Sequence, residues 1–590
     1  MKKTIALLLA ILLLGSMGCT AAPQASDEIA SATAPQAEES PEITTEPAPT
    51  TAMVQEREVF AALVADRKSE IRNSTSDYPT DGSVYYVSNS GDDSNDGLSR
   101  ETAWQTLDKV NSGAWVWEGQ LNSEQFPEYL WTSEHPDEQI SLQSGDTVLF
   151  ERGGLWRGRL QTVEGVTYSA YGEGDKPRIY GSPENGTGAE KWTLLDGTTN
   201  IWRYHLPMQQ CGIIVCDIDT IALRDYAYYH DGVYYKMASN ATLPWEEVAQ
   251  LPEIKPESIS ENLHFLCEIP SVDDGEYCWM SGALYLRCDE GNPGEVFSSI
   301  EFATGNNGWN EGMARVHSNV TLDNLCFCYG MSGIFVHDSE NAIIRNCEVS
   351  YVGGMIISAG GGSDISDRPE ECSLTCSGDA ILLGGVNNVA ENNYITNTFD
   401  YGVTVEAFSG DPESPYRSGC RVLGNLLETC NGGLLVVDWN AIINQKEAPV
   451  FTDITLSENV VAYSGCNQWA HYDQRFDENW NYTGDGYGDS ELGLWINPGC
   501  KDIRVENNVF GFGYENEYQI ALTYVDSDMS WLTAAGNTFL AEYGAKFISV
   551  NRYGSGTNED SYLRFDVDGD FEKTVREQLK DNDCKLTLVE

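Results

Sequence analysis

Two aspartates precede short apolar runs that are typical of β-strands, and together they could serve as a catalytic pair. Asp379 stands in "SGDAIL" and Asp400 in "FDYGVT". If the two runs form neighbouring strands of a parallel stack, about 4.8 Å apart, their carboxyl groups lie within about 5–10 Å of each other. That separation suits glycoside hydrolysis, in which one carboxyl group is the acid and the other the base or nucleophile. An Asp at the turn before a strand is also common without catalysis, so a structural role is the alternative.

Further carboxylates and two tryptophans extend this candidate site. Aligned apolar runs read GIFVH, GMIIS, AILLG, GVTVE, GLLVV and GLWIN. Side chains of a strand alternate between its two faces. We assume that two apolar residues of each run face inward, as in Ile334/Val336, Val403/Val405 and Leu494/Ile496. The last residue of each run then faces outward. The outward column then consists of His337, Ser358, Gly384, Glu406, Val437 and Asn497, with Asp438 one residue beyond. Polar groups beside Trp439 and Trp495 fit a groove that binds sugars. The predicted catalytic residues are Asp379, Asp400, Glu406 and Asp438.

Inserted loops are candidate walls of this groove. Residues 465–491 carry several aromatic and polar side chains, and Arg417 lies in the loop 409–419, where it could orient a hydroxyl or carboxylate of a substrate. Long loops with polar and aromatic clusters often form binding walls, and a surface loop without function is the alternative. The predicted substrate-binding residues are His337, Arg417, Trp439, His471, Tyr472, Asp473, Trp495 and Asn497.

A repeat from about residue 316 onward indicates the fold that must position these side chains. Each unit contains an Asn, an apolar pair, a Gly and a short apolar strand, and the marker asparagines are Asn324, Asn346, Asn393, Asn425, Asn459, Asn508 and Asn537. The shortest spacing, 22 residues, suits three short strands per coil, with insertions at the turns. Asn tolerates αL geometry and can hydrogen-bond to its counterpart on the next coil. We predict an all-β chain, a right-handed parallel β-helix (a single-stranded solenoid) with an N-terminal helix and an irregular, aromatic-rich insertion.

The segment "YYVSNSGDDSNDGLSRETAWQTLDKV" (85–110) resembles the opening segment of many bacterial right-handed β-helix proteins of the pectate-lyase-like type. "GDTVLFERGGLWRG" and "YGEGDKPRIYGS" resemble the segments that follow in this family. The resemblance, over roughly 84–555, implies the fold but no single reaction, because the family includes lyases, glycoside hydrolases and proteins of unknown activity. "SGDAI" also resembles the Gly-Asp-Asp segment of pectin-cleaving β-helix hydrolases, with Asp379 at the first Asp and Ala380 in place of the second.

The amino terminus, "MKKTIALLLAILLLGSMGC", has two lysines, an apolar run and then Cys19. The short apolar run predicts a secretory signal and not a membrane span. Cys19 after small residues resembles a bacterial lipoprotein signal, which implies lipidation at Cys19. We expect an exported protein that is lipid-anchored at the bacterial cell surface, with plain secretion or a periplasmic location as the alternatives.

The expected organisation follows from composition and periodicity. Residues 54–72 have helical periodicity, with Val59, Phe60, Leu63 and Val64 on one side, and we expect this helix to cover an end of the main domain. "NLHFLCEI" and "GALYLRC" predict a hairpin. The expected segments are a lipoprotein-type signal (1–19), a disordered Ala/Thr/Pro/Glu tether (20–53), a helical cap (54–83), a β-helix (84–555, insertion-rich at 190–302 and clearly coiled at 316–555) and a C-terminal cap segment (556–590).

The charge and cysteine content of the chain limit the kinds of ligand and partner that we expect. A net charge of −56 argues against nucleic acid, and only 11 Lys and Arg occur between residues 300 and 555, which favours a neutral or lightly charged ligand. The 16 cysteines show no CxxC pair, and no His cluster accompanies them, so no zinc site is predicted. We expect a polysaccharide or oligosaccharide substrate, membrane contact through the lipid anchor only, and a monomer.

Three functions stay open at this stage. The first is a cell-surface glycoside hydrolase that uses Asp379, Asp400 and Glu406. The second is a polysaccharide lyase, which needs a base and a positive group beside a uronate carboxylate. No Lys occurs between Lys255 and Lys446, so His337, or His471 with Tyr472, would have to be that base. The third is a non-catalytic carbohydrate-binding surface protein.

The acidic turn "SGDDSNDG" (90–97) is similar to a calcium loop only at its start. In an EF-hand numbered from Asp92, position 12 would be a bidentate Glu, and here it is Ala103. We therefore expect a turn at the beginning of the β-helix, capped by Asp93 or Asn95. No cofactor is predicted, and Ca²⁺ at this turn is the alternative.

Overall fold

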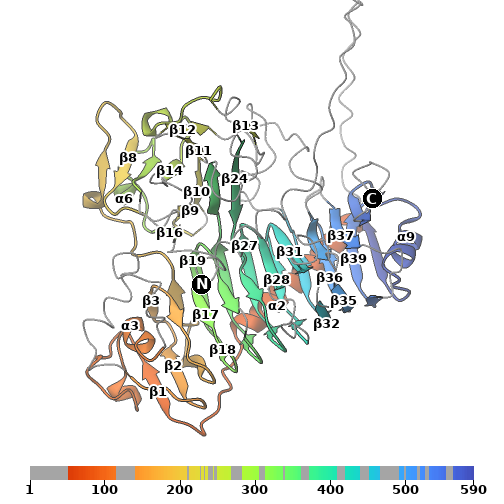
Figure 1. Cartoon of the computed structure of the whole chain (residues 1–590), viewed down its shortest axis with the longest axis horizontal. Coiled ribbons are helices and arrows are strands. Elements are labelled where there is room, and N and C mark those ends of the chain that lie inside the picture. Colours follow the sequence, from red (N-terminus) through yellow and green to blue (C-terminus); the bar gives the residue numbers. More distant parts are fainter. Residues whose placement is uncertain are drawn as a thin grey trace, which may run out of the picture.

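The chain forms a right-handed parallel β-helix, seen in a computed structural model as an elongated solenoid with three parallel sheets as its faces (Figure 1). This confirms the predicted all-β fold. The described residues are 51–114, 140–208, 211–218, 220–225, 227–230, 233–236, 243–244, 249–267, 282–304, 312–336, 339–360, 371–407, 419–438, 451–465, 491–496, 500–513, 518–524, 531–552 and 562–589.

Each complete coil contributes one strand to each face, which we call sheets C, A and B in chain order. Sheet A contains β1 (Val84–Val87), β2 (Thr147–Glu151), β5 (Thr167–Tyr171), β18 (Thr321–Asp323), β21 (Ile343–Arg345), β26 (Val389–Glu391), β29 (Arg421–Leu423), β32 (Phe451–Ser457), β35 (Cys500–Glu506) and β38 (Leu532–Ala535). Sheet B contains β3 (Leu155–Arg157), β6 (Arg178–Tyr180), β19 (Cys326–Gly330), β22 (Glu348–Val352), β27 (Tyr394–Thr398), β30 (Leu426–Glu428), β33 (Val460–Ala462), β36 (Val509–Gly511), β39 (Thr538–Glu542) and β42 (Lys585–Val589). Sheet C contains β4 (Leu160–Gln161), β17 (Ala314–Val316), β20 (Ile334–Val336), β25 (Ile381–Leu383), β28 (Tyr401–Ala407), β31 (Gly432–Asp438), β34 (Glu491–Ile496), β37 (Tyr518–Tyr524), β40 (Lys546–Arg552) and the antiparallel β41 (Tyr562–Asp566).

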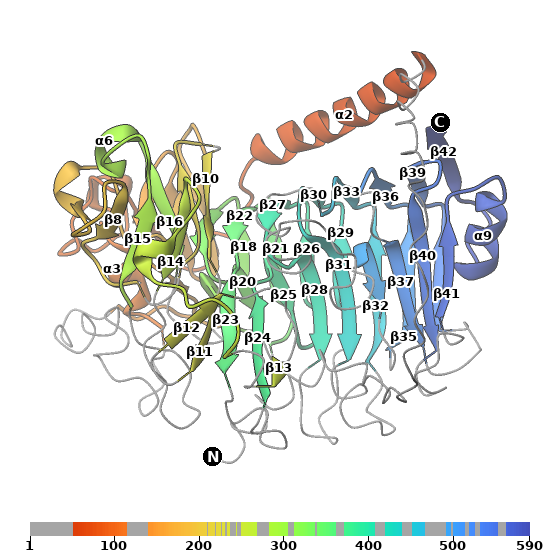
Figure 2. The same cartoon turned by 90° about the horizontal axis from the view of Figure 1, so that it is seen from above.

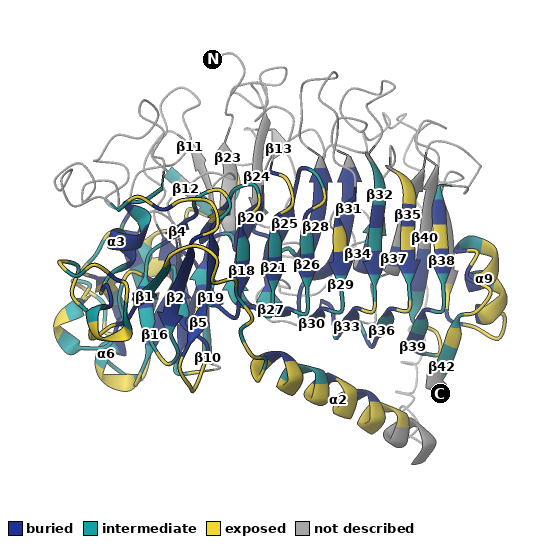
Figure 3. Ribbon diagram, turned by 90° about the horizontal axis from the view of Figure 1, so that it is seen from below, coloured by how far each residue is buried: buried dark blue, intermediate teal, exposed yellow. Residues whose placement is uncertain are grey.

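The core is a set of inward columns that run along the solenoid. In sheet C one column consists of Ile334, Ile381, Val403, Leu434 and Leu494, which pair in register from strand to strand. Each is at most 1% exposed, and the strands of this sheet carry long buried stretches (Figure 3). Burying such a side chain contributes about 1.5–3 kcal/mol, so the stacking of coils is the main source of stability. The predicted inward positions of these strands are confirmed.

Five marker asparagines form a buried ladder along one turn of the solenoid, and they are Asn393, Asn425, Asn459, Asn508 and Asn537. At each step the backbone N–H and the side-chain amide of one Asn donate to Oδ1 of the next, at 2.9–3.1 Å. The carboxylate of Asp581 accepts the last two bonds, from Asn537. The predicted hydrogen bonding between counterparts on successive coils is confirmed for these five.

Asn324 and Asn346 do not belong to the ladder, which corrects the prediction. They lie one position earlier in the turn, with φ of 60° and 53°. In the coil that contains Asn346, the ladder position is occupied by Cys347, whose N–H donates to Asn393 Oδ1 at 2.9 Å. The left-handed position of later coils is filled by Asn392, Gly424, Glu458, Asn507 and Gly536. Left-handed geometry and stacking therefore belong to two adjacent positions and not to one Asn.

A largely antiparallel insertion interrupts the solenoid between β6 and β17. The first strands after it, β17, β18 and β19, pair with β4, β5 and β6, so the coils before and after the insertion stack directly. The predicted hairpin is confirmed, because β14 and β15 pair antiparallel. The insertion contains β7 (Trp192–Leu194), β8 (Ile201–Tyr204), β9 (Cys211–Cys216), β10 (Thr220–Arg224), β11 (Ala227–His230), β12 (Val233–Lys236), β13 (Leu243–Pro244), β14 (His264–Cys267), β15 (Leu284–Arg287), α6 (Pro293–Val296) and β16 (Ile300–Thr304).

The predicted N-terminal helix is present as α2 (Thr51–Arg72), but it lies along the side of the solenoid and not over an end (Figure 2). It contacts β27, β30 and β42 of sheet B. Phe60 and Val64 are 1% and 3% exposed, whereas Val59 and Leu63 are 59% and 40% exposed. Residues four apart lie on one helix face, so only one of the two predicted pairs reaches the body.

Short elements lie at the two ends of the solenoid. Asp93 accepts hydrogen bonds from the N–H of Gln105 and from the N–H and hydroxyl of Thr106, the residue that caps α3 (Leu107–Asn111), so it joins the acidic turn to the start of this helix. The nearby backbone N–H groups of Ser94 and Leu98 donate to Asp92 and Asp96, which corrects the predicted cap. At the other end, α9 (Phe571–Gln578) packs apolar side chains against the core of the solenoid. No helix in the described ranges is both long and apolar enough to cross a membrane.

Candidate acidic site on sheet C

The candidate site is centred on β28, in the middle of sheet C. Val403 and Val405 are buried in the core, so the alternation of the strand directs Thr404 and Glu406 outward. Both outward residues are nonetheless buried, Thr404 at 0% and Glu406 at 3% exposure. A carboxylate this far removed from water needs compensating neighbours, which makes the position of Glu406 unusual for a β-helix surface.

The start of β28 departs from strict alternation. A Cβ atom built on Gly402 would lie 2.6 Å from the side chain of Leu427, a core residue, so position 402 also points inward. Tyr401 is consequently on the outward side, at the same end of the strand as Asp400. A glycine at 402 is what allows two successive inward positions here without a clash.

Asp379 and Asp400 lie at the starts of adjacent strands, as predicted. Strands β25 and β28 pair in parallel with Ile381 opposite Val403. The N–H of Tyr401 donates to Oδ1 of Asp379 at 3.1 Å. This bond fixes the carboxyl group of Asp379 beside the residue that follows Asp400.

The carboxyl group of Asp379 has a strongly altered environment. It is 7% exposed. Burial, and after it the charges of Asp400 and Glu406, raises the pKa of Asp379 well above its usual range, and the hydrogen bond from Tyr401 opposes this only in part. Asp400 and Glu406, the other two carboxyl groups that the sequence singled out, therefore each lie close enough to Asp379 to affect its pKa. A protonated carboxyl beside other carboxylates is the arrangement that acid–base catalysis uses.

The raised pKa of Asp379 predicts a stability penalty that depends on pH. Above the ordinary carboxyl value of about 4, the folded chain keeps a proton that the unfolded chain releases, so stability falls as pH rises toward the raised pKa. We expect Asp379→Asn to increase the free energy of unfolding by about 1–2 kcal/mol at pH 7, and to change it little near pH 3. Urea unfolding at both pH values measures this. The exposed Asp175→Asn is the control, and equal effects of both substitutions at pH 7 would contradict the prediction.

Aromatic side chains border the acidic group. The ring of Tyr401 lies over Gly432 of the next strand, where a Cβ atom would be 2.4 Å from ring carbons. Trp495, one strand further on, has its ring centroid 6.3 Å from that of Tyr401, at 35° between the planes. The indole Nε1 of Trp495 and Oγ1 of Thr404 are buried and have no hydrogen-bond partner among the described residues. Both atoms are thus available to a bound molecule or to water.

The remaining predicted residues divide into three cases. Asp438 ends β31, with its backbone opposite Ala407. Ser358 leaves the outward column, which is a correction: it belongs to β23 (Met355–Gly360), which pairs antiparallel with β24 (Glu371–Ser377) and not with sheet C. The residues that lie outside the described part of the chain are Cys19, His337, Arg417, Trp439, His471, Tyr472, Asp473 and Asn497.

The departure of β23 from the stack has a visible cause. Gly353 and Gly354, with φ of 111° and 75°, direct the chain out of the coil before Met355. The stack resumes at Ile381, which pairs with Ile334. The sequence "GMIIS" resembles the strands of sheet C. It lies outside that sheet because β23 pairs antiparallel with β24.

Two residues of the site were missed from the sequence. Tyr401 and Thr404 were not singled out, although both stand in "FDYGVTVE" between the predicted carboxylates. The available signal was Thr404 itself, a polar residue at an outward position between two core valines. The orientation of Tyr401 had no signal, because it depends on the inward turn of Gly402.

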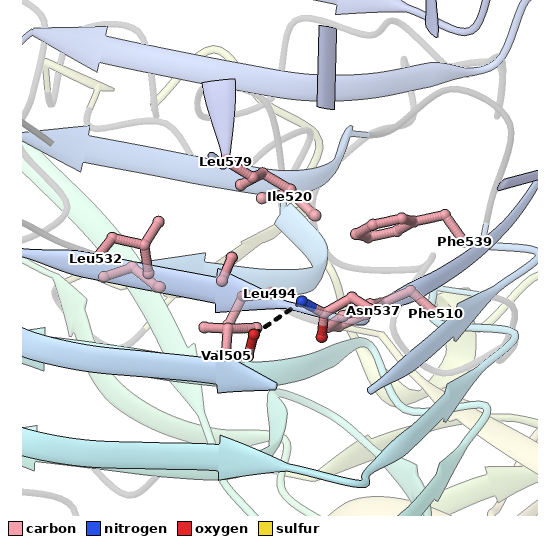
Figure 4. Close-up of a pocket in the computed structure, with 10 residues that line it drawn as sticks. Leu494, Val505, Phe510, Ile520, Leu532, Asn537, Phe539 and Leu579 are labelled. Carbon is pink, nitrogen blue, oxygen red and sulfur yellow. Dashed lines mark hydrogen bonds between the residues drawn. The ribbon is translucent and has the colours of Figure 1, made fainter. Parts of the chain in front are cut away.

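A small cavity lies elsewhere in the molecule. It is inside the solenoid near its C-terminal end and is lined mainly by apolar residues such as Leu494, Ile520 and Phe539 (Figure 4). Asn537, its polar lining residue, donates to the carbonyl of Val505 at 2.8 Å. This cavity is a packing space in the core, and the acidic group lies on the outer side of the sheet. Within the described ranges no cluster of three or more His, Cys, Asp or Glu could hold a metal ion.

One family model matches part of the solenoid. Residues 309–473 match the family described as right handed beta helix region. One similar solved structure is XylC in complex with xylose, with 13% sequence identity, 79% of this chain and 71% of that chain covered, and a TM-score of 0.39. Another is a glycoside hydrolase, with 9% sequence identity, 80% of this chain and 95% of that chain covered, and a TM-score of 0.39. A rhamnogalacturonan lyase is also similar (11%, 81% and 86%, 0.27). No curated protein matches the sequence. Likenesses this distant say nothing about the reaction.

Proposed function

Since this chain is a right-handed parallel β-helix protein, we propose that it is a carbohydrate-active enzyme, a glycoside hydrolase whose paired carboxylates lie on sheet C. The observation that carries the proposal is the raised pKa of Asp379, buried beside Asp400 and Glu406. Glycoside hydrolysis needs one carboxyl group that is protonated at working pH and a second that is ionised. Asp379 has the raised pKa that the acid requires, and we propose Asp400 as its ionised partner.

In the proposed mechanism Asp379 is the general acid. It donates its proton to the glycosidic oxygen while the bond from that oxygen to the anomeric carbon breaks. Asp400 is the second catalytic carboxylate, because its charge affects Asp379 more than that of Glu406 does. Asp400 either attacks the anomeric carbon or takes a proton from the attacking water, and Glu406 stabilises the positive charge that develops on the sugar. Asp438 remains a proposed further carboxylate at the end of the neighbouring strand.

The test is a screen of the purified chain against plant and host polysaccharides. Release of reducing ends without absorbance near 235 nm is the expected result, and NMR of the first product identifies the anomer. Unsaturated products that absorb near 235 nm from a uronate polymer would instead establish the polysaccharide lyase. Binding without any cleavage would establish the carbohydrate-binding protein, and either of these two results contradicts the proposal.

We also propose an exported, monomeric protein that is lipid-anchored through Cys19 at the bacterial cell surface. The proposed tether is 20–50, since α2 begins at Thr51 and not after the predicted boundary at residue 53. The proposed hydrolysis requires no cofactor, and Ca²⁺ at the acidic turn is a separate proposal. Fractionation tests the anchor: detergent, and not high salt, should release the protein from membranes. Release by salt alone would contradict a lipid anchor.

A further inference from the structure

Three side chains at the acidic site have no part in the proposed acid–base chemistry: Tyr401, Thr404 and Trp495. We infer that they form a binding subsite for an uncharged pyranose unit, with the two aromatic rings as its stacking surface and the Thr404 hydroxyl and Trp495 indole N–H as hydrogen-bond partners. This inference rests on the proposed glycoside hydrolase function and specifies the substrate class.

The stacking surface spans three strands. Tyr401 belongs to β28 and Trp495 to β34, and the strand between them, β31, presents Gly432 at the level of the tyrosine ring. Both rings are partly exposed, and their planes differ by 35°. A larger residue at 432 would displace the tyrosine. Rings held in this way can pack against the apolar face of a sugar ring.

The polar atoms point to a ligand with hydroxyl groups. Thr404 Oγ1 and Trp495 Nε1 are buried without a partner in the described part of the chain. An unpaired buried polar atom costs about 1–3 kcal/mol, so a ligand group that forms a hydrogen bond with it gains affinity. Thr404 and Trp495 lie on the same outward row of sheet C, since Thr404 pairs with Leu435 and Leu435 with Trp495. The backbones of the two residues are therefore two strand spacings apart, about 9.6 Å.

The charges around the subsite favour an uncharged unit. Asp379, Asp400 and Glu406 already place three carboxyl groups here, and no cation among the described residues alters the pKa of Asp379. Arg315, a described cation on sheet C, is on β17, three strands or about 14 Å from β28. A uronate would bring another carboxylate to a buried acidic group that has no counter-charge among the described residues, which is unfavourable.

The experiment measures binding in an Asp379→Asn background, where hydrolysis is expected to be about 10³–10⁴-fold slower. Calorimetric titration compares hexasaccharides cut from xylan, β-mannan and galactan with uronate hexamers from polygalacturonate and alginate. We expect a neutral hexasaccharide to bind at least 10-fold more tightly than any uronate hexamer. We expect Trp495→Phe, which keeps a ring but removes the indole N–H, and Thr404→Val, which keeps the shape but removes the hydroxyl, each to weaken binding about 5–10-fold.

Matched variants separate binding from folding. Trp202→Phe removes another buried indole N–H without a described partner, in the insertion, and it should leave binding unchanged. Thr404→Ser restores the hydroxyl and should restore affinity. Tighter binding of a uronate hexamer, no binding of any neutral hexamer, or equal affinity of Thr404→Val and the parent overturns the inference. If the parent chain still hydrolyses a polysaccharide while one of these results is obtained, the inferred subsite is wrong but the proposed function is not contradicted. Binding as expected without hydrolysis refutes only the proposed function.

Discussion

Asp379→Asn is expected to lower kcat for polysaccharide hydrolysis by a factor of about 10³–10⁴, with KM nearly unchanged. The amide has the size of the carboxyl group but no proton of suitable acidity to give to the leaving oxygen. The N–H of Tyr401, which now donates to Asp379 Oδ1 at 3.1 Å, still has an amide oxygen to meet, so the site keeps its shape. Initial rates of reducing-end release over a range of substrate concentrations measure both constants.

A substrate with an acidic leaving group distinguishes the proposed role of Asp379 from that of Asp400. A nitrophenyl glycoside needs little help from a proton donor, so it should restore much of the rate in Asp379→Asn. The same substrate should not rescue Asp400→Asn, because the lost group there acts at the anomeric carbon. Asp175→Asn, an exposed substitution, is the control for both. More than a tenth of the parent rate on polysaccharide in Asp379→Asn would refute the assignment of the acid.

The pH profile of the parent enzyme carries the same information. An acid must be protonated, so activity should persist above the ordinary carboxyl range and decline only as pH rises through the raised pKa of Asp379. Burial is the first cause of that shift, and the charges of Asp400 and Glu406 follow. Activity that already declines between about pH 4 and pH 5 would mean that another group is the acid.

Asn459→Ala is expected to lower the free energy of unfolding by about 3–5 kcal/mol, the second large effect. The Asn459 side chain, 0% exposed, accepts from the N–H and amide of Asn425 and donates to the carbonyl of Val422 and to Oδ1 of Asn508, at 2.9–3.0 Å. Alanine removes all four bonds and leaves buried donors and acceptors unpaired. Denaturant unfolding monitored by circular dichroism gives the difference.

The control for the ladder is Asn582→Ala. Asn582 is exposed, and among the described residues its amide reaches the carbonyl of Lys580 alone, at 3.5 Å, so its loss should cost less than about 0.5 kcal/mol. If Asn459→Ala were as mild as this control, the ladder would be a consequence of the stacked coils and would not contribute to their stability.

Local pattern was sufficient for the architecture and for part of the site. The repeat, the alternation of Val403 and Val405 with outward residues, and the carboxylates Asp379, Asp400 and Glu406 are all visible in the sequence. They are visible because a solenoid is made of nearest-neighbour pairings with a short period, so equivalent residues recur along the chain. The position of each predicted carboxylate within its coil followed from the same register.

Tertiary structure decided what depends on partners distant in sequence. Turn geometry excludes Asn346 from the asparagine ladder, and strand pairing excludes Ser358 from the outward column of sheet C. Neither can be deduced from the neighbouring residue types alone. Tertiary structure turned Tyr401 outward through the inward Gly402, and it laid α2 along the coils. It also raised the pKa of Asp379, since the acidity of a carboxyl group is set by burial and neighbouring charge, which exist only once the coils are stacked.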